Sequence, residues 1–183
     1  DIIDRGLDHF GDFYWCNDTY LDLNRRFIVP FYYNGNIVGY TSRIIDNNKD
    51  KPKYFTNSQP NYMYNMDVLS KKRKYLIVVE GVLDALSIDG LAVLHNKLNQ
   101  VQIDLIKEFD GEIIVCPDRD AAGSTLIDQA LENKWSVSFP PWQDNIKDCA
   151  DAVKNYGQLF TVKSIIDSRV NNKTKIEVLR KIA

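Results

Sequence analysis

The segment YLIVVEGVLDALSI, residues 75–88, decides the fold of this chain. Its first five residues, Tyr75–Val79, all favour β structure, which is typical of a strand buried on both faces of a sheet. Glu80 and Gly81 come next, and a helical pattern follows over Val82–Ile88. A buried strand that runs straight into a helix predicts one βα unit of an α/β domain.

The same alternation continues towards the C-terminus. Val101, Leu105 and Phe109 recur at helical spacing and are expected on one face of their helix. Repeated βα units predict a mainly parallel sheet with right-handed crossovers and helices on its faces. The expected strands are Leu91–Leu94, Glu112–Cys116 and Trp135–Phe139, and the expected helices are Asn99–Phe109, Ala121–Asn133 and Asp148–Tyr156.

Upstream the pattern is different and favours antiparallel strands. Arg26–Tyr33 and Asn36–Ile45 are β-rich runs separated by Asn34-Gly35, a pair that tolerates positive φ and therefore predicts a hairpin. Residues 46–60 are expected to form a long loop. The fold class is α/β in its main domain and α+β overall, with a small basic β-rich subdomain over 1–70, the parallel-sheet domain over 71–160 and a helical tail over 161–183.

The net charge of −2 over 183 residues conceals an uneven distribution. Residues 23–75 hold ten basic and three acidic side chains, giving +7. The segments on either side are acidic, at −5 for residues 1–22 and −4 for residues 76–183. A basic block next to an acidic one suits a chain that grips a polyanion with one part and holds cations with another. A solvated, lysine-rich linker at 71–74 explains that short run equally well.

Composition excludes several classes of protein. An apolar fraction of 44% with 11% aromatic residues predicts a packed core rather than disorder. The three cysteines, Cys16, Cys116 and Cys149, form no Cys-x-x-Cys pair, which argues against a disulfide framework or a structural zinc site and fits a reducing cytoplasm. No run approaches the ~18 apolar residues of a membrane span. Because Asp1 stands where a Met would initiate, we expect a piece of a longer protein.

Acidic side chains follow the expected strands at their carboxyl ends, where ligands bind in open α/β sheets. Glu80 follows the first strand and Asp84 lies one helical turn further on. Asp118 and Asp120 follow the third strand, and Asp148 follows the fourth. Carboxylates that converge at one sheet edge repel one another unless a cation neutralises them, and Mg²⁺ prefers such hard oxygen ligands. Helix N-capping is the simpler explanation for an isolated Asp-x-Asp, but not for one paired with an acid at an equivalent strand end.

These motifs resemble the TOPRIM fold of primases and topoisomerases. The order of strand, Glu80-Gly81-x-x-Asp84, strand, Asp118-x-Asp120-x-x-Gly123 and Lys147-Asp148 is similar to that family, and the first motif is most similar to its primase version. Upstream, RFIVPF at 26–31, GYTSR at 39–43 and PKYFTNS at 52–58 resemble, in the same order, the basic subdomain of bacterial DnaG-type replicative primases. The resemblance covers about residues 23–157.

The resemblance implies roles for individual residues. Glu80 is similar to the family's catalytic glutamate, Asp118 and Asp120 to its catalytic, metal-binding pair, and Asp148 to a further metal ligand, with Mg²⁺ or Mn²⁺ as the cofactor. The residues expected to bind the template strand or the incoming nucleotide are Arg25, Arg26, Arg43, Lys53 and Asn57. Three departures are clear: YMYNMDVL at 62–69 replaces a family Lys-containing stretch, Asp151 has no assigned role, and no cysteine cluster or nucleotide-binding loop of a helicase is present.

The function expected from the resemblance is that of a DNA primase catalytic core. It would synthesise short RNA primers on a single-stranded DNA template from ribonucleoside triphosphates, beside a replicative helicase in cis or in trans, in the cytoplasm of a bacterial or phage-infected cell and away from membranes. Two alternatives stay open. One is a TOPRIM metal-dependent nuclease, and the other is a catalytically idle nucleic-acid-binding module of a larger replication protein.

Overall fold

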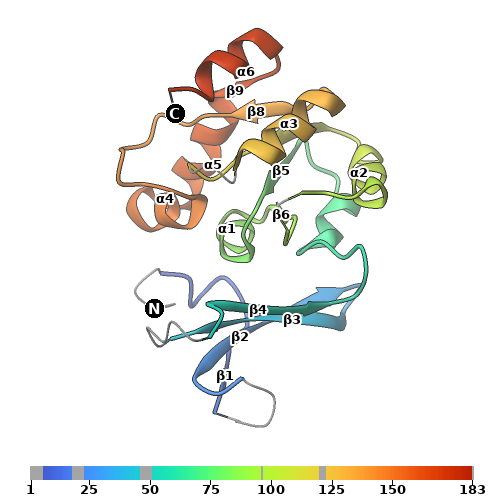
Figure 1. Ribbon diagram of the computed structural model, residues 1–183, viewed down its shortest axis with the longest axis vertical. Coiled ribbons are helices and arrows are strands. Elements are labelled where there is room, and N and C mark those ends of the chain that lie inside the picture. Colours follow the sequence, from blue (N-terminus) through green and yellow to red (C-terminus); the bar gives the residue numbers. More distant parts are fainter. Residues whose placement is uncertain (1–5, 18–22, 46–50, 96, 120–122, 183) are drawn as a thin grey trace. The chain divides into compact units, whose positions relative to one another are not determined.

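The computed structural model describes residues 6–17, 23–45, 51–95, 97–119 and 123–182 (Figure 1). They form two compact units, residues 1–62 and 63–183. This division falls eight residues before the expected end of the basic subdomain. The second unit includes residues 161–183, which the sequence analysis expects to form a helical tail. The full domain assignment from sequence stays a prediction.

The described residues of the first unit form an antiparallel sheet in the order β1-β2-β3-β4. The predicted hairpin is confirmed: β2 (Arg26–Tyr33) and β3 (Asn36–Ile44) pair from Tyr33↔Asn36 onwards. Asn34 and Gly35 have φ of 50° and 76°, which are the positive values that a two-residue hairpin turn requires. The outer strands are β1 (Tyr14–Cys16) and β4 (Tyr54–Ser58).

The long loop expected over 46–60 is wrong in its second half, because β4 lies there. Its pairing with β3 includes a hydrogen bond of 2.8 Å between the hydroxyls of Thr41 and Thr56. β4 is an edge strand with mostly exposed side chains, so its sequence carries none of the apolar alternation by which strands are recognised.

The second unit is built on the parallel sheet that the sequence predicts. Its order is β6-β5-β7-β8-β9, and all pairs are parallel except the last. The strands are β5 (Tyr75–Val79), β6 (Leu91–Ala92), β7 (Glu112–Val115), β8 (Ser136–Ser138) and β9 (Arg169–Val170). The helices are η1 (Met66–Ser70), α1 (Val82–Ile88), α2 (Gln100–Lys107), α3 (Gly123–Asn133), α4 (Cys149–Tyr156), α5 (Gln158–Asp167) and α6 (Lys173–Leu179).

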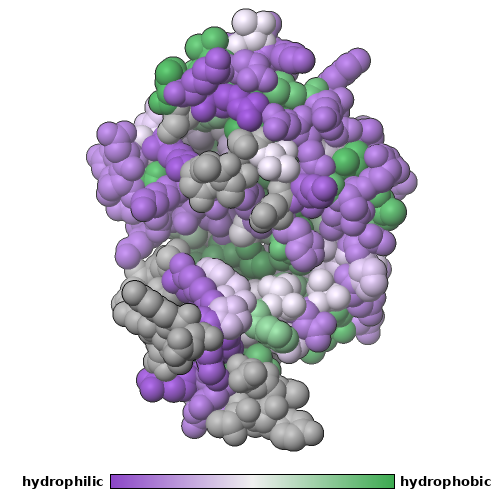
Figure 2. Space-filling view, viewed as in Figure 1, coloured by the Kyte–Doolittle hydropathy of each residue, from purple (hydrophilic) through white to green (hydrophobic). Residues whose placement is uncertain are grey.

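Helices cover both faces of the sheet (Figure 1), so alternate side chains of the strands face two helical layers. Leu76, Val78 and Val115 belong to a buried cluster with residues of α2 and α3. Ile77 faces the opposite way, towards residues of α1 and α5. A sheet covered on both faces is what the continuous apolar run of β5 predicts. The surface that this unit presents in Figure 2 is mostly hydrophilic.

Two local predictions for this unit are wrong. The buried face of α2 carries Gln102, Ile103 and Ile106, while Val101 is half exposed. Gln102 is buried because it completes a capping box with Asn99, so a polar residue takes a place that the apolar pattern assigned to others. The helical tail expected over 161–183 is interrupted by β9, a two-residue edge strand that pairs with β8.

No helix among the described residues is long and apolar enough to span a membrane.

Asp89 fixes the start of β5 to the end of α1. It ends the helix in a left-handed conformation, with φ of 49°, and its carboxylate accepts hydrogen bonds from Arg73 and from Asn65. Partial burial alone would raise the pKa of Asp89, but the hydrogen bonds from Arg73 and Asn65 and the charges of Arg73 and Lys71 outweigh it and hold this pKa below its ordinary value.

Asp89→Asn is therefore expected to destabilise the second unit in a pH-dependent way. A carboxyl with a lowered folded pKa contributes stability above its unfolded value of 3.8 and loses it as the pH falls through the folded value. The deficit of the variant should be present at pH 7, at up to about 1 kcal/mol for a half-exposed ion pair, and shrink at pH 3. Urea unfolding followed by the fluorescence of buried Trp135 and Trp142 measures it. A deficit that stays constant with pH, or that matches Asp104→Asn, would contradict this role.

Candidate active site

Glu80 and Asp118 follow neighbouring parallel strands at the same edge of the sheet. β5 and β7 pair in the register Val78↔Val115, and the amide of Cys116 donates to the carbonyl of Val78 over 2.9 Å. Glu80 comes two residues after Val78, and Asp118 comes three residues after Val115. Both side chains are half-buried, and the Oε1 atom of Glu80 is fully buried. The structure therefore brings these two predicted site residues to one edge.

Asp148 reaches the same region from the start of α4. It is the N-cap of that helix, and its Oδ1 accepts a hydrogen bond of 2.7 Å from the amide of Asp151. The preceding carbonyl, that of Lys147, accepts a bond of 3.1 Å from the amide of Arg119. A backbone hydrogen bond thus joins the loop of Asp118 to the loop of Asp148. Capping occupies one oxygen of Asp148, and a capping carboxylate can still offer its second oxygen to a cation.

Asp84, in the first turn of α1, is buried in the second unit. Only 6% of it is exposed, and its Oδ1 accepts a hydrogen bond of 2.9 Å from the amide of Ala150 in α4. This contact spans 66 residues of sequence, so local pattern could not reveal it.

Two buried cysteines, Cys116 and Cys149, lie close in the chain to Asp118 and Asp148. The thiol of Cys149 donates to the sulfur of Cys116, with 3.8 Å between the sulfur atoms. This hydrogen bond, burial and the nearby charges of Asp84 and Asp118 raise the pKa of Cys149 well above its ordinary value. The thiol therefore stays protonated and is a poor nucleophile. The charges of Asp84 and Asp118 therefore both act on the Cys149 thiol.

Arg119 holds the site together rather than facing a phosphate. Its guanidinium donates to the carbonyl of Pro140 over 2.6 Å and to those of Trp142 and Gln143 over 3.2 Å, and it lies over the Trp142 ring. The long-range contact with the loop after β8 is not visible in the sequence.

Arg26 is likewise a structural residue. Its side chain is 2% exposed and donates to the carbonyls of Pro52, over 2.8 Å, and Lys53. A guanidinium buried against backbone carbonyls is not available to a template strand, so the predicted nucleic-acid role of Arg26 does not fit its place in the first unit.

The other predicted basic residues are more accessible. Arg43 and Tyr54 are paired across β3 and β4, and the Arg43 guanidinium donates to the Tyr54 hydroxyl over 3.1 Å. The Lys53 ammonium lies 5.7 Å from the centre of the same ring. Asn57 is exposed but occupies the alternate face of β4, so it lies on the opposite side of the sheet from Arg43. Arg25 is exposed at the start of β2.

The donor chemistry of the strand-end acids fits a hard divalent cation. Asp120 lies outside the described residues, and within those that are described no three His, Cys, Asp or Glu side chains form a ready-made metal group. Mg²⁺ nevertheless needs only one or two carboxylates, because it keeps several waters and binds substrate phosphates. Glu80, Asp118 and Asp148 present such oxygens at one edge of the sheet.

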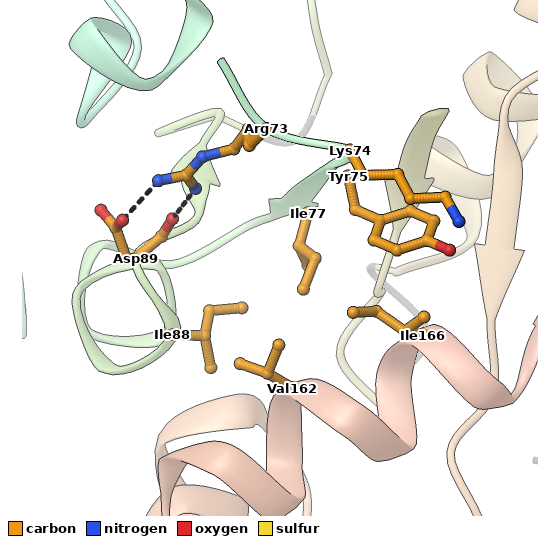
Figure 3. Close-up of a pocket in the computed structure, with 8 residues that line it drawn as sticks. All are labelled: Arg73, Lys74, Tyr75, Ile77, Ile88, Asp89, Val162 and Ile166. Carbon is orange, nitrogen blue, oxygen red and sulfur yellow. Dashed lines mark hydrogen bonds and ion pairs between the residues drawn. The ribbon is translucent and has the colours of Figure 1, made fainter. Parts of the chain in front are cut away.

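The described hollows of the second unit lie away from these acids. One of about 210 Å³ is lined by residues of the opposite end of β5, with Tyr75, Ile77 and the Arg73–Asp89 pair around it (Figure 3). Another, of about 290 Å³, lies along α5.

Comparison with known proteins agrees with this geometry. Residues 77–153, which hold all the strand-end acids, match the Toprim-like family model. Among curated proteins, the chain is 27% identical over 164 residues to the DNA primase of Mycoplasma genitalium and 27% identical over 170 residues to that of Clostridium acetobutylicum. These alignments cover 79% and 81% of this chain.

Solved structures show the same fold. The DnaG catalytic core superposes with a TM-score of 0.66 at 21% identity, covering 91% of this chain and 58% of that one. The zinc-binding and RNA polymerase domains of the Aquifex aeolicus primase give 0.62 at 23% identity, covering 80% and 41%. The resemblance to a TOPRIM primase core is therefore confirmed in sequence and in fold. The chain spans only 27% and 28% of the length of the two curated relatives.

Proposed function

We propose that this chain is the catalytic core of a DNA primase, which joins ribonucleotides on a single-stranded DNA template. The observation that carries the proposal is the meeting of Glu80, Asp118 and Asp148 at one sheet edge, within the segment that matches the Toprim-like model. The similarity to bacterial primases supports the same conclusion.

The strand-end acids would have different roles in the reaction. Asp118, Asp148 and, by sequence position, Asp120 would hold Mg²⁺ or Mn²⁺, which when bound supplies positive charge for the triphosphate and the transition state. Glu80 would accept the proton of the attacking 3′-hydroxyl or share the cation. The new bond joins that oxygen to the α-phosphorus of the incoming nucleotide, and pyrophosphate leaves. The backbone hydrogen bond between Arg119 and Lys147 would help to hold Asp118 and Asp148 beside each other.

The first unit would bind the strand. Exposed Tyr54 and Phe55 offer rings for base stacking, and Arg43 and Lys53 beside Tyr54 offer cations for phosphates. Arg25 would add a further exposed cation, whereas Asn57 lies with Phe55 on the opposite face of the sheet from Arg43. A replicative helicase partner, in cis or in trans, is proposed because one structure of the same fold is the primase fragment of the bacteriophage T7 primase-helicase protein, with a TM-score of 0.59.

Primer extension tests the proposed chemistry. The chain is given an RNA primer annealed to a DNA template, with ribonucleotides and Mg²⁺ or Mn²⁺, so that initiation is not required. Asp118→Asn should reduce nucleotide addition at least ~100-fold, because the lost charge weakens the hold on the cation and the transition state. Binding of the primer–template should change little.

Asp104→Asn is the matched control, since this exposed acid of α2 lies away from the site and is bonded to Gln100. Undiminished extension by Asp118→Asn would refute the mechanism. Shortening of labelled DNA without nucleotide addition would instead identify a nuclease. DNA binding with no reaction under either cation would identify an idle binding module.

The salt dependence of single-stranded DNA binding tests the first unit. Each phosphate contact to a single strand contributes about −0.7 to the slope of log K against log salt. Arg43→Met and Lys53→Met should each make that slope shallower by about this amount, measured by fluorescence anisotropy. Lys163→Met on α5 is the control. Equal slopes for all these variants and the parent would place the strand elsewhere.

A further inference from the structure

Asp84 lies between the N-termini of two helices. It is in the first turn of α1, whose N-cap is Gly81, and its Oδ1 accepts the amide hydrogen of Ala150 in the first turn of α4. Both helix ends carry partial positive charge, and a carboxylate is stabilised there. Asp84 is therefore buried, and its carboxylate is bound by the backbone of a helix other than its own.

The packing around Gly81 keeps this carboxylate in place. A Cβ atom at position 81 would overlap Oδ2 of Asp84. The absence of a side chain at Gly81 thus lets the Asp84 carboxylate fold back over the loop that carries Glu80. The Oδ1 atom accepts from the Ala150 amide and the Oδ2 atom packs against Gly81, so both carboxylate oxygens contact the protein.

The hydrogen bond between Asp84 and Ala150 joins the region of Glu80 to the region of Asp148. On one side, Asp84 is four residues from Glu80; on the other, Ala150 is two residues from Asp148. The far end of α1 is also tied, because the Gln158 side chain donates to the carbonyl of Ser87 over 2.9 Å. Helix α1 is thus fastened at both ends to the α4–α5 region.

We infer that Asp84 is a positioning residue that sets the spacing of Glu80 and Asp148 through its hydrogen bond to the Ala150 amide, and that it is not itself a ligand of the cation. The inference deepens the proposed function and rests on it. Groups that orient metal-binding residues from behind typically change metal affinity 10–100-fold when removed.

Three variants separate this role from direct ligation. Asp84→Asn keeps an oxygen that can accept from Ala150 but lacks the charge of a ligand. Asp84→Ala removes the acceptor. Gly81→Ala keeps Asp84 and displaces it, so it should resemble Asp84→Ala and add little in a double variant. Asp104→Ala is the control.

Two measurements on the whole chain give the readout. The first is amide hydrogen exchange at Ala150, which needs no metal: protection should fall at least ~10-fold in Asp84→Ala and in Gly81→Ala, and stay within about 3-fold of the parent in Asp84→Asn. The second is Mn²⁺ binding followed by electron paramagnetic resonance. The affinity for Mn²⁺ should fall ~10-fold or more in Asp84→Ala and in Gly81→Ala, and should stay within about 3-fold of the parent in Asp84→Asn.

The outcomes distinguish the inference from the proposal beneath it. Equal loss of Mn²⁺ affinity in Asp84→Asn and Asp84→Ala, with Ala150 still protected in Asp84→Asn, would make Asp84 a ligand and overturn the inference alone. Lost protection with unchanged Mn²⁺ affinity would reduce Asp84 to a stabilising residue and also overturn it. Failure of the parent chain to bind Mn²⁺ would overturn the metal site of the proposed function and the inference with it.

Discussion

The register between β5 and β7 is the constraint on which the rest of the second unit depends. Parallel pairing at Val78↔Val115 brings Glu80 and Asp118 to one edge, where their like charges oppose folding. Two other acids of this region are bound by neutral donors: the amide of Ala150 donates to Asp84, and that of Asp151 donates to Asp148. Helix N-termini thus stabilise two of the acids.

The loops that carry the acids are joined by contacts distant in sequence. The Arg119 amide bonds to Lys147, and its guanidinium fixes the carbonyls after β8. The buried sulfurs of Cys116 and Cys149 lie at the roots of the same two loops, next to Asp118 and Asp148. These contacts hold the two loops together at one edge of the sheet. Preorganised charge is the form of catalysis that phosphoryl transfer uses most.

Sequence alone predicted the βα alternation, the hairpin at Asn34-Gly35 and the edge at which the acids meet. These features follow from local apolar pattern and from the direction of parallel strands. It did not predict β4, the burial of Arg26 or Asp84, or the anchoring role of Arg119. Each of these depends on a partner far away in the chain, such as Pro52 for Arg26 and Ala150 for Asp84. A basic residue type therefore does not show by itself whether the side chain is exposed. Of the adjacent Arg25 and Arg26, the first is exposed and the second is buried.

The central claim is that the strand-end acids share one cation, and affinity cleavage tests it most directly. Fe²⁺ substituted for Mg²⁺, with ascorbate and peroxide, generates radicals that cut the backbone next to the bound metal. Cleavage is expected in three segments at once, near residues 80, 118 and 148, and excess Mg²⁺ should suppress all three. Cleavage confined to one of these segments, or located at other parts of the chain, would contradict it.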